Sequence, residues 1–495
     1  MAGKESKHDT GRKVGSVAMS ALMVWSMAPH PVIAQTATGS AAEDGDGQTP
    51  QEALEQNPAQ QEAEVVTAEN DGSDAAADEA AAEETQEALG EKLDAAAPAP
   101  ADGAAGAASE TDADADADAG AQKSTANAAA AAATTAQNVP YVDGSGTLKQ
   151  VTSATLLSSA LASSATLPTG WYLVDTDITQ AQRIVASGDV HLILGDGKTL
   201  TAQGGITVPS GSTLTVYGQT AQTGALVAKA PAPGAAIGGV SGVACGDIVI
   251  DGGTITATST SGPGIGAVSG AAGTVAVNGG SVTSTGIGGA GPTDGVTAVT
   301  INGGTVTSTA KSGPGISAVS STGKVTINGG TVTAKAGDTN SAGIGGFGTG
   351  DAPGVSIAGG TVKATGGSFS AGIGSGSMGS GSGAGNCNAI SITGGNVTAI
   401  GGSNGGAAIG GGRGNRDGGT ILISGPNTVV KATANGYSGA IGGGRSGHCG
   451  NVTISNGARV TAQSATEAIG AGDGGAATGS ITINGAYVLC TTAGD

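Results

Sequence analysis

The sequence predicts an all-β protein, a right-handed, three-sided parallel β-helix (solenoid) preceded by a disordered acidic linker. A unit close to V-T-I-N-G-G-T-V-T-A recurs nine times from Asp247 onward, and a lone Ile between small residues recurs alongside it. Repeats of this length are typical of solenoids, in which each repeat forms one coil and stacking buries a continuous core. The third observation is charge, because the acidic residues gather before residue 141.

Residues 1–34 have the pattern of a secretory signal peptide. Four basic residues precede an apolar stretch from Val14 to Ala28, and Val32-Ile33-Ala34 offers a cleavage site before Gln35. The apolar stretch is short and contains Ser and Gly, so we expect no stable membrane span in this chain. The pattern predicts export, and hence a secreted or bacterial cell-surface location.

Residues 35–140 are expected to form a disordered linker rich in Ala, Asp and Glu. Residues 1–140 hold 25 of the 39 acidic residues but only 6 of the 19 basic ones. Such a composition cannot bury enough apolar surface to offset the entropy of ordering the chain. The acidic balance also argues against nucleic acid as a partner, because phosphate binding needs clustered Lys and Arg.

Residues 141–246 are predicted to form the first β-helix coils and a cap. Alternating runs such as D-V-H-L-I-L indicate strands. Trp171, Tyr172 and Tyr217 are interpreted as core or cap residues, because large aromatic side chains usually bury their area. The same alternation predicts that His191 faces solvent, and we assign it no role.

Residues 247–495 form the predicted nine-copy repeat region, in which each unit contains two strands that meet at a corner. In the clearest copy, Val325 and Ile327 alternate with polar residues, as Val332 and Ala334 do after Asn328-Gly329-Gly330. Asn and Gly tolerate the left-handed backbone that a sharp bend needs. The other copies begin at Ile248, Val275, Val299, Val355, Ile390, Ile421, Val452 and Ile481.

A third strand in each coil is marked by the lone Ile. Its spacing varies from 22 to 36 residues, which fits a three-sided coil whose loops absorb insertions. Leucine-rich repeats, propeller blades and calcium-binding nonapeptides would each need signatures that the chain lacks. The third-strand positions are Ile237, Ile265, Ile287, Ile316, Ile344, Ile373, Ile409, Ile441 and Ile469.

Four cysteines are expected to be small buried hydrophobic residues rather than disulfide partners. Cys245, Cys387 and Cys449 occupy one phase of the repeat but lie in non-adjacent coils, so the closest pair would be about 9.6 Å apart. Disulfide Cα separations rarely exceed about 7 Å. Cys490 matches the inward position of Ala334.

The stretch from Gly170 to Gln219, followed by I-N-G-G-T-V-T-A and A-G-I-G-G repeats, resembles pectin-lyase-like β-helix surface proteins of Gram-positive gut bacteria. The resemblance covers roughly residues 141–495. It implies an adhesin-like, carbohydrate-binding protein at the cell surface. Anchored members of that group carry a C-terminal sorting signal, which is not found here, and the chain stops at Asp495 just before an expected A-I-G strand, so we expect it to be a fragment.

The carboxylates of the repeat region do not predict catalysis. Polysaccharide lyases and glycoside hydrolases on this fold need clustered carboxylates, whereas no two here share a phase in adjacent coils. We therefore expect no enzyme activity, no cofactor and no metal, since His448 beside Cys449 supplies too few ligands. A lyase or hydrolase is the alternative function.

When the coils are aligned on their lone Ile, one group of basic residues occupies equivalent positions in adjacent coils. Arg413 and Arg445 stand four residues after their coil's Ile, Arg416 and His448 stand seven after, and Asp473 follows in the next coil. A row of Arg can hold carboxylate or sulfate groups, so an anionic glycan of a host or cell-wall surface is the expected ligand. The alternative is a solvated charged edge with a weak Arg445–Asp473 pair.

Two other patterns give weaker indications of function. The aromatic residues of the repeats lie in separate coils, which argues against a stacking platform for neutral sugars. Thr pairs such as Thr254/Thr256 and Thr331/Thr333 resemble ice-binding β-helices, a remote alternative, although Thr suits any exposed strand. We expect a non-catalytic adhesin-like or spacer module that binds carbohydrate.

Overall fold

The computed structural model describes residues 134–231, 233–289, 291, 293–337, 340–379, 384–414 and 418–492. The predicted signal peptide, residues 1–34, and the predicted linker as far as residue 133 lie outside the described residues. What is described belongs to one compact unit, Ala121–Asp495.

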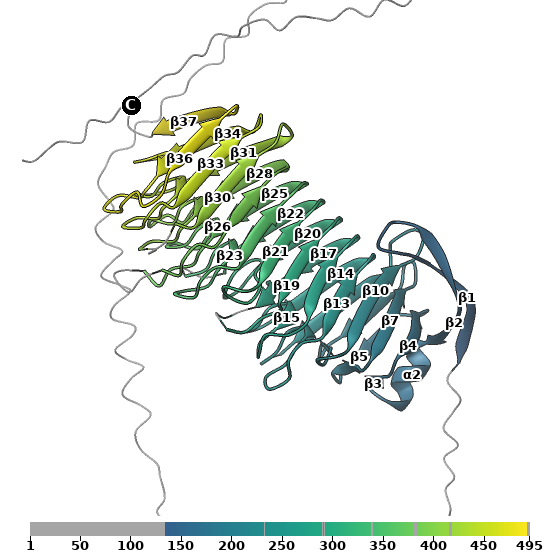
Figure 1. Ribbon diagram of the computed structural model, residues 1–495. Helices are drawn as coiled ribbons and strands as arrows, with labels where there is room; N and C mark the ends of the chain where they lie inside the picture. The colour runs from purple at the N-terminus through teal and green to yellow at the C-terminus, as the bar shows by residue number, and fades with distance from the viewer. Residues whose placement is uncertain are drawn as a thin grey trace, which may run out of the picture. The chain divides into compact units, whose positions relative to one another are not determined.

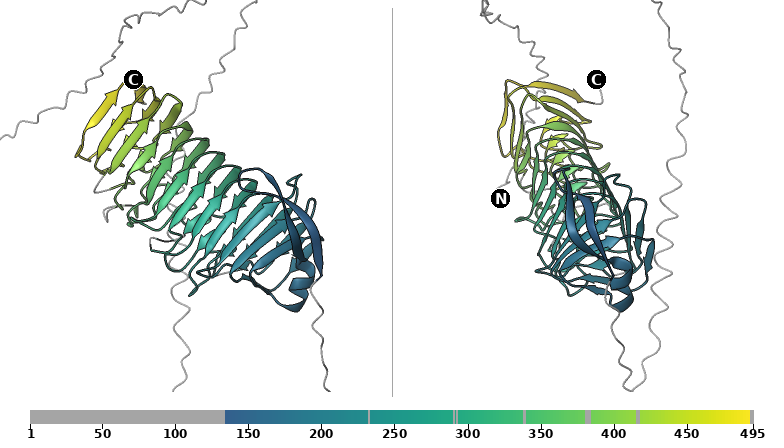
Figure 2. Two further views of the ribbon diagram at one scale, coloured as in Figure 1. Left: turned by 45° about the vertical axis from the view of Figure 1, so that its right-hand side comes forward. Right: turned by 90° about the vertical axis from the view of Figure 1, so that its right-hand side faces the viewer.

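The described chain is a parallel β-helix, as the repeat predicts, and its strands stack into three faces (Figures 1 and 2). We name the faces sheets A, B and C. Sheet A contains β1 (Thr135–Val142), β2 (Leu148–Leu156), β4 (Gly170–Val174), β7 (Asp189–Leu194), β10 (Thr213–Gly218), β13 (Asp247–Ile250), β16 (Thr274–Val277), β19 (Ala298–Ile301), β21 (Lys324–Ile327), β24 (Gly354–Ile357), β27 (Ile390–Ile392), β30 (Thr420–Ser424), β33 (Asn451–Ser455) and β36 (Ile481–Asn484).

The second strand of each coil belongs to sheet C, and the third belongs to sheet B. Sheet C contains β5 (Ile178–Gln180), β8 (Thr199–Ala202), β11 (Ala225–Ala230), β14 (Thr254–Ser259), β17 (Ser281–Ser284), β20 (Thr305–Thr309), β22 (Thr331–Lys335), β25 (Thr361–Thr365), β28 (Gly395–Ile400), β31 (Thr428–Thr433), β34 (Arg459–Ser464) and β37 (Tyr487–Thr492). Sheet B contains β3 (Thr166–Leu167), β6 (Ile184–Ala186), β9 (Ile206–Thr207), β12 (Ile237–Gly238), β15 (Ile265–Ala267), β18 (Ile287–Gly289), β23 (Ile344–Gly345), β26 (Ile373–Gly374), β29 (Ile409–Gly410), β32 (Ile441–Gly442) and β35 (Ile469–Gly470).

The register of the strands confirms the assignment of the repeat. In sheet A, Val325 pairs with Val299 on one side and Val355 on the other. In sheet B, the nine predicted Ile form one continuous column from Ile237 to Ile469, in which Ile316 is joined to its neighbours by isolated bridges. Because strand side chains alternate, these residues point inward and form the hydrophobic core.

In the nine-copy repeat region, each corner between sheets A and C contains a glycine in the left-handed conformation. Gly330 has φ +81°, and a Cβ atom there would lie 2.7 Å from the carbonyl oxygen of Gly304 in the previous coil. The second Gly of Asn-Gly-Gly, rather than the Asn, therefore adopts the left-handed conformation.

The Asn residues of these corners form a hydrogen-bonded ladder instead. Asn328 Nδ2 donates to Asn302 Oδ1, Asn302 Nδ2 donates to Asn278 Oδ1, and Asn278 Nδ2 donates to Asp251 Oδ1, each at 2.7 Å. The ladder ends on the carboxylate of Asp251. It stops at Ala358, which follows Asn328 in the next coil.

The N-terminal end is closed by a β-hairpin, β1–β2, followed by a short helix, α2 (Leu157–Ser163). The predicted boundary at residue 140 lies inside β1, which begins at Thr135 and pairs with β2 at every residue except Asn138. Only Thr155 and Leu156 of β2 pair with β4, so most of the hairpin does not continue the hydrogen-bonded ladder of sheet A (Figure 1). In the described part of the chain, no helix has the length and apolar character needed to cross a membrane.

The hairpin packs on the outer face of sheet A. Val139 and Ala154 of the hairpin form a second hydrophobic cluster with Ile193 and Tyr217 of the sheet, separate from the solenoid core. The alternation along β7 and β10 directs Ile193 and Tyr217 outward, and the hairpin then covers them. We call this contact the clasp.

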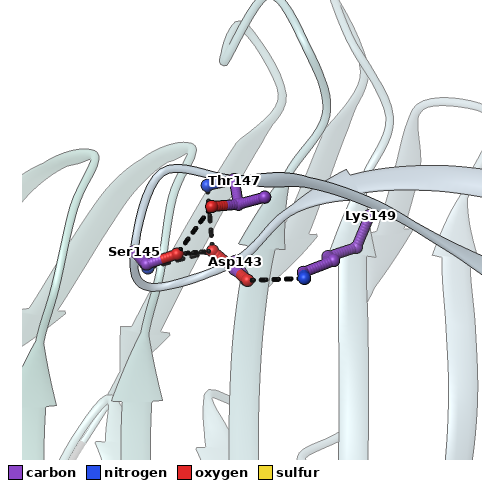
Figure 3. Close-up of polar contacts among 4 residues, drawn as sticks. All are labelled: Asp143, Ser145, Thr147 and Lys149. Carbon is purple, nitrogen blue, oxygen red and sulfur yellow. Dashed lines mark hydrogen bonds and ion pairs between the residues drawn. The ribbon is translucent and has the colours of Figure 1, made fainter.

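The loop at the tip of the hairpin is held by its own side chains (Figure 3). Asp143 Oδ1 accepts hydrogen bonds from the backbone N–H groups of Ser145 (3.0 Å) and Thr147 (2.9 Å) and from the Ser145 hydroxyl (2.6 Å). These bonds lower the pKa of Asp143, and Lys149 Nζ lies 3.9 Å from its Oδ2. Within the same loop, the backbone of Gly144 bonds to Asp251, which anchors the tip to sheet A.

The cysteines are free, as expected, but one of them is not buried. Cys245, Cys387 and Cys449 are buried, and burial raises the pKa of the Cys245 thiol to about 12. Cys490 pairs with Ala462 in the predicted inward column, yet its side chain is exposed, because β37 is the outermost described strand of sheet C. The prediction of a buried Cys490 is therefore wrong.

The column of inward Ile predicts that shortening one of these side chains destabilises the protein. Ile373 is fully buried between Ile344 and Ile409, so Ile373→Ala should lower the free energy of unfolding by about 2–5 kcal/mol. Thr361→Ala, on the exposed face of the same coil, should change it by less than about 0.5 kcal/mol. Urea unfolding followed by circular dichroism measures both, and equal effects would contradict the inward assignment.

The contact between the hairpin tip and Asp251 predicts that the stability of the protein depends on pH. Burial raises the pKa of Asp251 above its usual value, with the nearby Asp143 adding to the rise, while bonds from Asn278 and Gly144 oppose it. A raised folded-state pKa means that the stabilisation from this group is present at low pH and is lost as pH rises through that pKa. Asp251→Asn should therefore be at least as stable as wild type at pH 7, with the difference shrinking towards pH 4.

Urea midpoints read from tryptophan fluorescence test this, because Trp171 lies in the clasp. Asp196→Asn, which changes a carboxylate outside the clasp, is the control. An Asp251→Asn variant less stable at pH 7 than at pH 4, relative to wild type, would contradict the expectation.

Candidate functional site

The predicted cationic row lies in the loops that join sheet B to sheet A. Arg413 lies between β29 and β30, and Arg445 lies between β32 and β33, one coil further on. The backbone N–H of Gly414 donates to the carbonyl oxygen of Arg445 at 2.8 Å. The two Arg are therefore neighbours along the axis, as the phase of their coils predicts.

Backbone contacts hold both Arg in place. The Arg413 N–H donates to the carbonyl of Phe369 at 2.8 Å, and the Ser377 hydroxyl donates to the Arg413 carbonyl at 2.7 Å. The Arg445 N–H donates to the carbonyl of Gly405 at 2.8 Å. A Cβ atom on Gly405 would lie 2.6 Å from that of Arg445, so the close approach requires glycine.

Each guanidinium group lies over an aromatic ring. Arg413 Cζ is 5.7 Å from the ring centroid of Phe369, and Arg445 Cζ is 5.1 Å from that of Tyr437. Both distances fall in the range of cation–π attraction. The rings come from the loops that join sheet C to sheet B, so loops from two corners of the coil meet at this edge. We call Phe369, Arg413, Tyr437, Arg445 and Asp473 the Arg edge.

Among the residues that the structure describes, the one charged partner of these Arg side chains is Asp473 in the coil after Arg445. Arg445 Nε and Asp473 Oδ2 are 4.0 Å apart, and their side chains are 39% and 57% exposed. The Asp473 N–H donates to the carbonyl of Tyr437 at 2.9 Å, which fixes the carboxylate at the end of the row. An exposed pair at this separation contributes little to stability, so a ligand anion can compete for Arg445.

The other two predicted residues add less to the row. Arg416 lies outside the described residues. His448 follows Arg445 in the same loop, but it is half-buried and its Nδ1 atom is shielded from solvent. Burial raises the pKa of the adjacent Cys449 thiol.

Among the described residues no group of three or more His, Cys, Asp or Glu side chains could hold a metal ion.

Four aromatic rings form a cluster in the clasp, and the sequence pattern does not predict their contacts. Trp171 and His191 stack with their ring centroids 4.1 Å apart, Tyr141 of the hairpin lies 4.9 Å from Trp171, and His191 Nδ1 is 3.0 Å from the Tyr217 hydroxyl. His191 therefore lies on the outer face of sheet A, but the prediction that it faces solvent is wrong, because neighbouring rings leave its side chain only 21% exposed. Its Nε2 lies 3.2 Å from Asp189 Oδ2. Because these rings cover one another, they hold the hairpin rather than offer a face to a sugar.

The Arg–aromatic pairs are the part of the site that sequence reasoning missed. Phe369 and Arg413 are far apart in sequence, and the loops between them vary in length from coil to coil, so no periodic signal links them. Comparison with known proteins finds no matching family model, curated protein or solved structure. The candidate site is therefore defined by the geometry of the Arg edge.

Proposed function

We propose that the protein is an exported, non-catalytic β-helix that acts as an adhesin-like or spacer module at the bacterial surface and binds an acidic polysaccharide at the Arg edge. The observation that carries this proposal is the pair of guanidinium groups in adjacent coils, each supported by an aromatic ring. Export is supported by the sequence of residues 1–34, and a spacer role by the length of the stack.

The chemistry of the Arg edge fits the carboxylate or sulfate groups of such a polysaccharide. A guanidinium group can donate two parallel hydrogen bonds to a planar carboxylate, which a Lys cannot do. The rings beneath Arg413 and Arg445 restrict the side chains before the ligand arrives, so less conformational entropy is lost on binding. Neighbouring coils are about 4.8 Å apart, which allows one chain of sugar acids to reach both Arg.

The absence of catalysis is part of the proposal. The Arg edge presents one carboxylate, Asp473, which faces Arg445 rather than a second carboxylate. General acid and base catalysis of glycosidic cleavage needs two such groups on opposite sides of the bond.

Removing the two Arg should weaken glycan binding without unfolding the protein. Arg413→Ala/Arg445→Ala should reduce affinity for polygalacturonate at least about ten-fold, because each charged hydrogen bond contributes about 1.5–3 kcal/mol. Both residues lie in loops away from the inward columns, so the circular dichroism spectrum should not change. Isothermal titration calorimetry measures the affinity.

The matched control is Lys311→Ala/Lys324→Ala, which removes the same charge from exposed positions outside the Arg edge. It should bind as wild type does, and neutral dextran should not bind to either protein. Equal losses in both double variants, or binding to dextran unaffected by either, would refute the Arg edge as the binding site.

Incubation with uronic acid polysaccharides should yield no new products. Neither absorbance of unsaturated uronates nor reducing ends should increase above a heat-inactivated sample, with or without calcium. Product formation that is lost in Asp473→Ala would assign the protein to the alternative class of lyases and hydrolases.

A further inference from the structure

The outer face of sheet C differs in charge from the rest of the chain. None of its strands, all within the described residues, contains Asp or Glu, although the whole chain has a net charge of −20. The strands of sheet A, in contrast, include Asp189 and Asp247. Sheet C carries five basic residues, which are Lys229, Lys335, Lys363, Lys431 and Arg459.

These five side chains are free to meet a partner. All are exposed, and the alternation along their strands directs them away from the core. Within the described residues none of them forms an ion pair. Arg459 alone has a partner of another kind, the ring of Tyr487, with its Cζ 5.3 Å from the ring centroid.

Four of the five lie along the axis of the solenoid. Lys363 and Lys431 belong to one column, with Thr398 between them, so they are two coils or about 9.6 Å apart. Lys335 lies in the coil before Lys363 and pairs with Thr365, whereas Arg459 lies in the coil after Lys431 and pairs with Val429. Each is therefore two residues, about 6.6 Å, from the Lys363 column, on opposite sides of it, and the four residues cross the face obliquely. The line therefore extends over five successive coils, about 19 Å. We call these four residues the sheet C line.

We propose that the sheet C line is a second binding surface, for a linear polymer of bridging phosphate groups without bases. Charge complementarity identifies a polyanion, since the face is purely cationic. Its oblique course over five stacked coils fits an extended chain rather than a compact ligand. Three of the four cations are Lys, which act as point charges on flexible stems and suit phosphate more than planar carboxylate.

Nucleic acid is disfavoured by the same face. Binding of single strands combines a basic groove with aromatic rings on which bases stack. The one ring on the strands of sheet C is Tyr487, and it lies beneath Arg459. The sheet C line is also separate from the Arg edge, which is built from loops beside sheet B. Either binding proposal can therefore be refuted without refuting the other.

The test compares two triple variants of the full chain with equal net charge. Lys335→Gln/Lys363→Gln/Lys431→Gln removes the Lys of the sheet C line, and Lys198→Gln/Lys311→Gln/Lys324→Gln removes three exposed Lys elsewhere. Binding to long-chain inorganic polyphosphate is measured by fluorescence anisotropy over a range of salt concentrations. The first variant should bind at least about ten-fold more weakly at low salt, and the slope of log affinity against log salt should fall by about 2.

The second triple variant and Arg413→Ala/Arg445→Ala should both bind polyphosphate as wild type does. Equal losses in the two triple variants would show an effect of net charge alone and would overturn the proposal, as would a wild-type protein that does not bind polyphosphate. Tighter binding to oligo-dT than to polyphosphate would replace the proposed polymer with nucleic acid. Retained affinity for polygalacturonate in the first variant separates this surface from the Arg edge.

Discussion

The whole structure depends on one constraint, that equivalent residues of successive coils lie in register about 4.8 Å apart. A residue that stacks on its own equivalent must match it in size, which is why the lone Ile recurs at 0% exposure through most of sheet B. The same register places a glycine above each corner glycine and an amide above an amide in the Asn ladder. Loop residues lie outside this register, so the sequence and length of the loops can vary from coil to coil.

That freedom explains where chemistry can arise in such a fold. The first few residues of a loop still lie beside the equivalent residues of the next coil, because the strand before the loop is in register. Arg413 and Arg445 are therefore neighbours although their loops differ in sequence. Loops from the preceding corner then bring Phe369 and Tyr437 beneath them. The Arg edge thus combines positions that the register fixes with contacts that it does not fix.

The sequence therefore revealed the fold more fully than the site. Periodicity alone predicts the inward columns and the phase of the two Arg, because both repeat with the coil. It does not predict that Thr135 begins a strand, since the partners of that strand lie on a hairpin used once. Alternation directs His191 outward correctly, but it cannot show that the rings of Trp171 and Tyr217 cover it. Cys490 illustrates a further limit, because an inward position is buried only where another coil covers it.

The attachment of the hairpin has a mechanical consequence. The chain enters the described fold at Thr135, which pairs with Thr155 at the open end of the hairpin, close to the only pairs that join β2 to β4. Tension on the chain before Thr135 therefore acts on the β1–β2 hydrogen bonds one pair at a time, as in opening a zipper, and does not shear the stacked coils. The first residues released are those of β1, and the next exposed are the rings of the clasp, so the hairpin would yield to a pulling force while the rod behind it keeps its length.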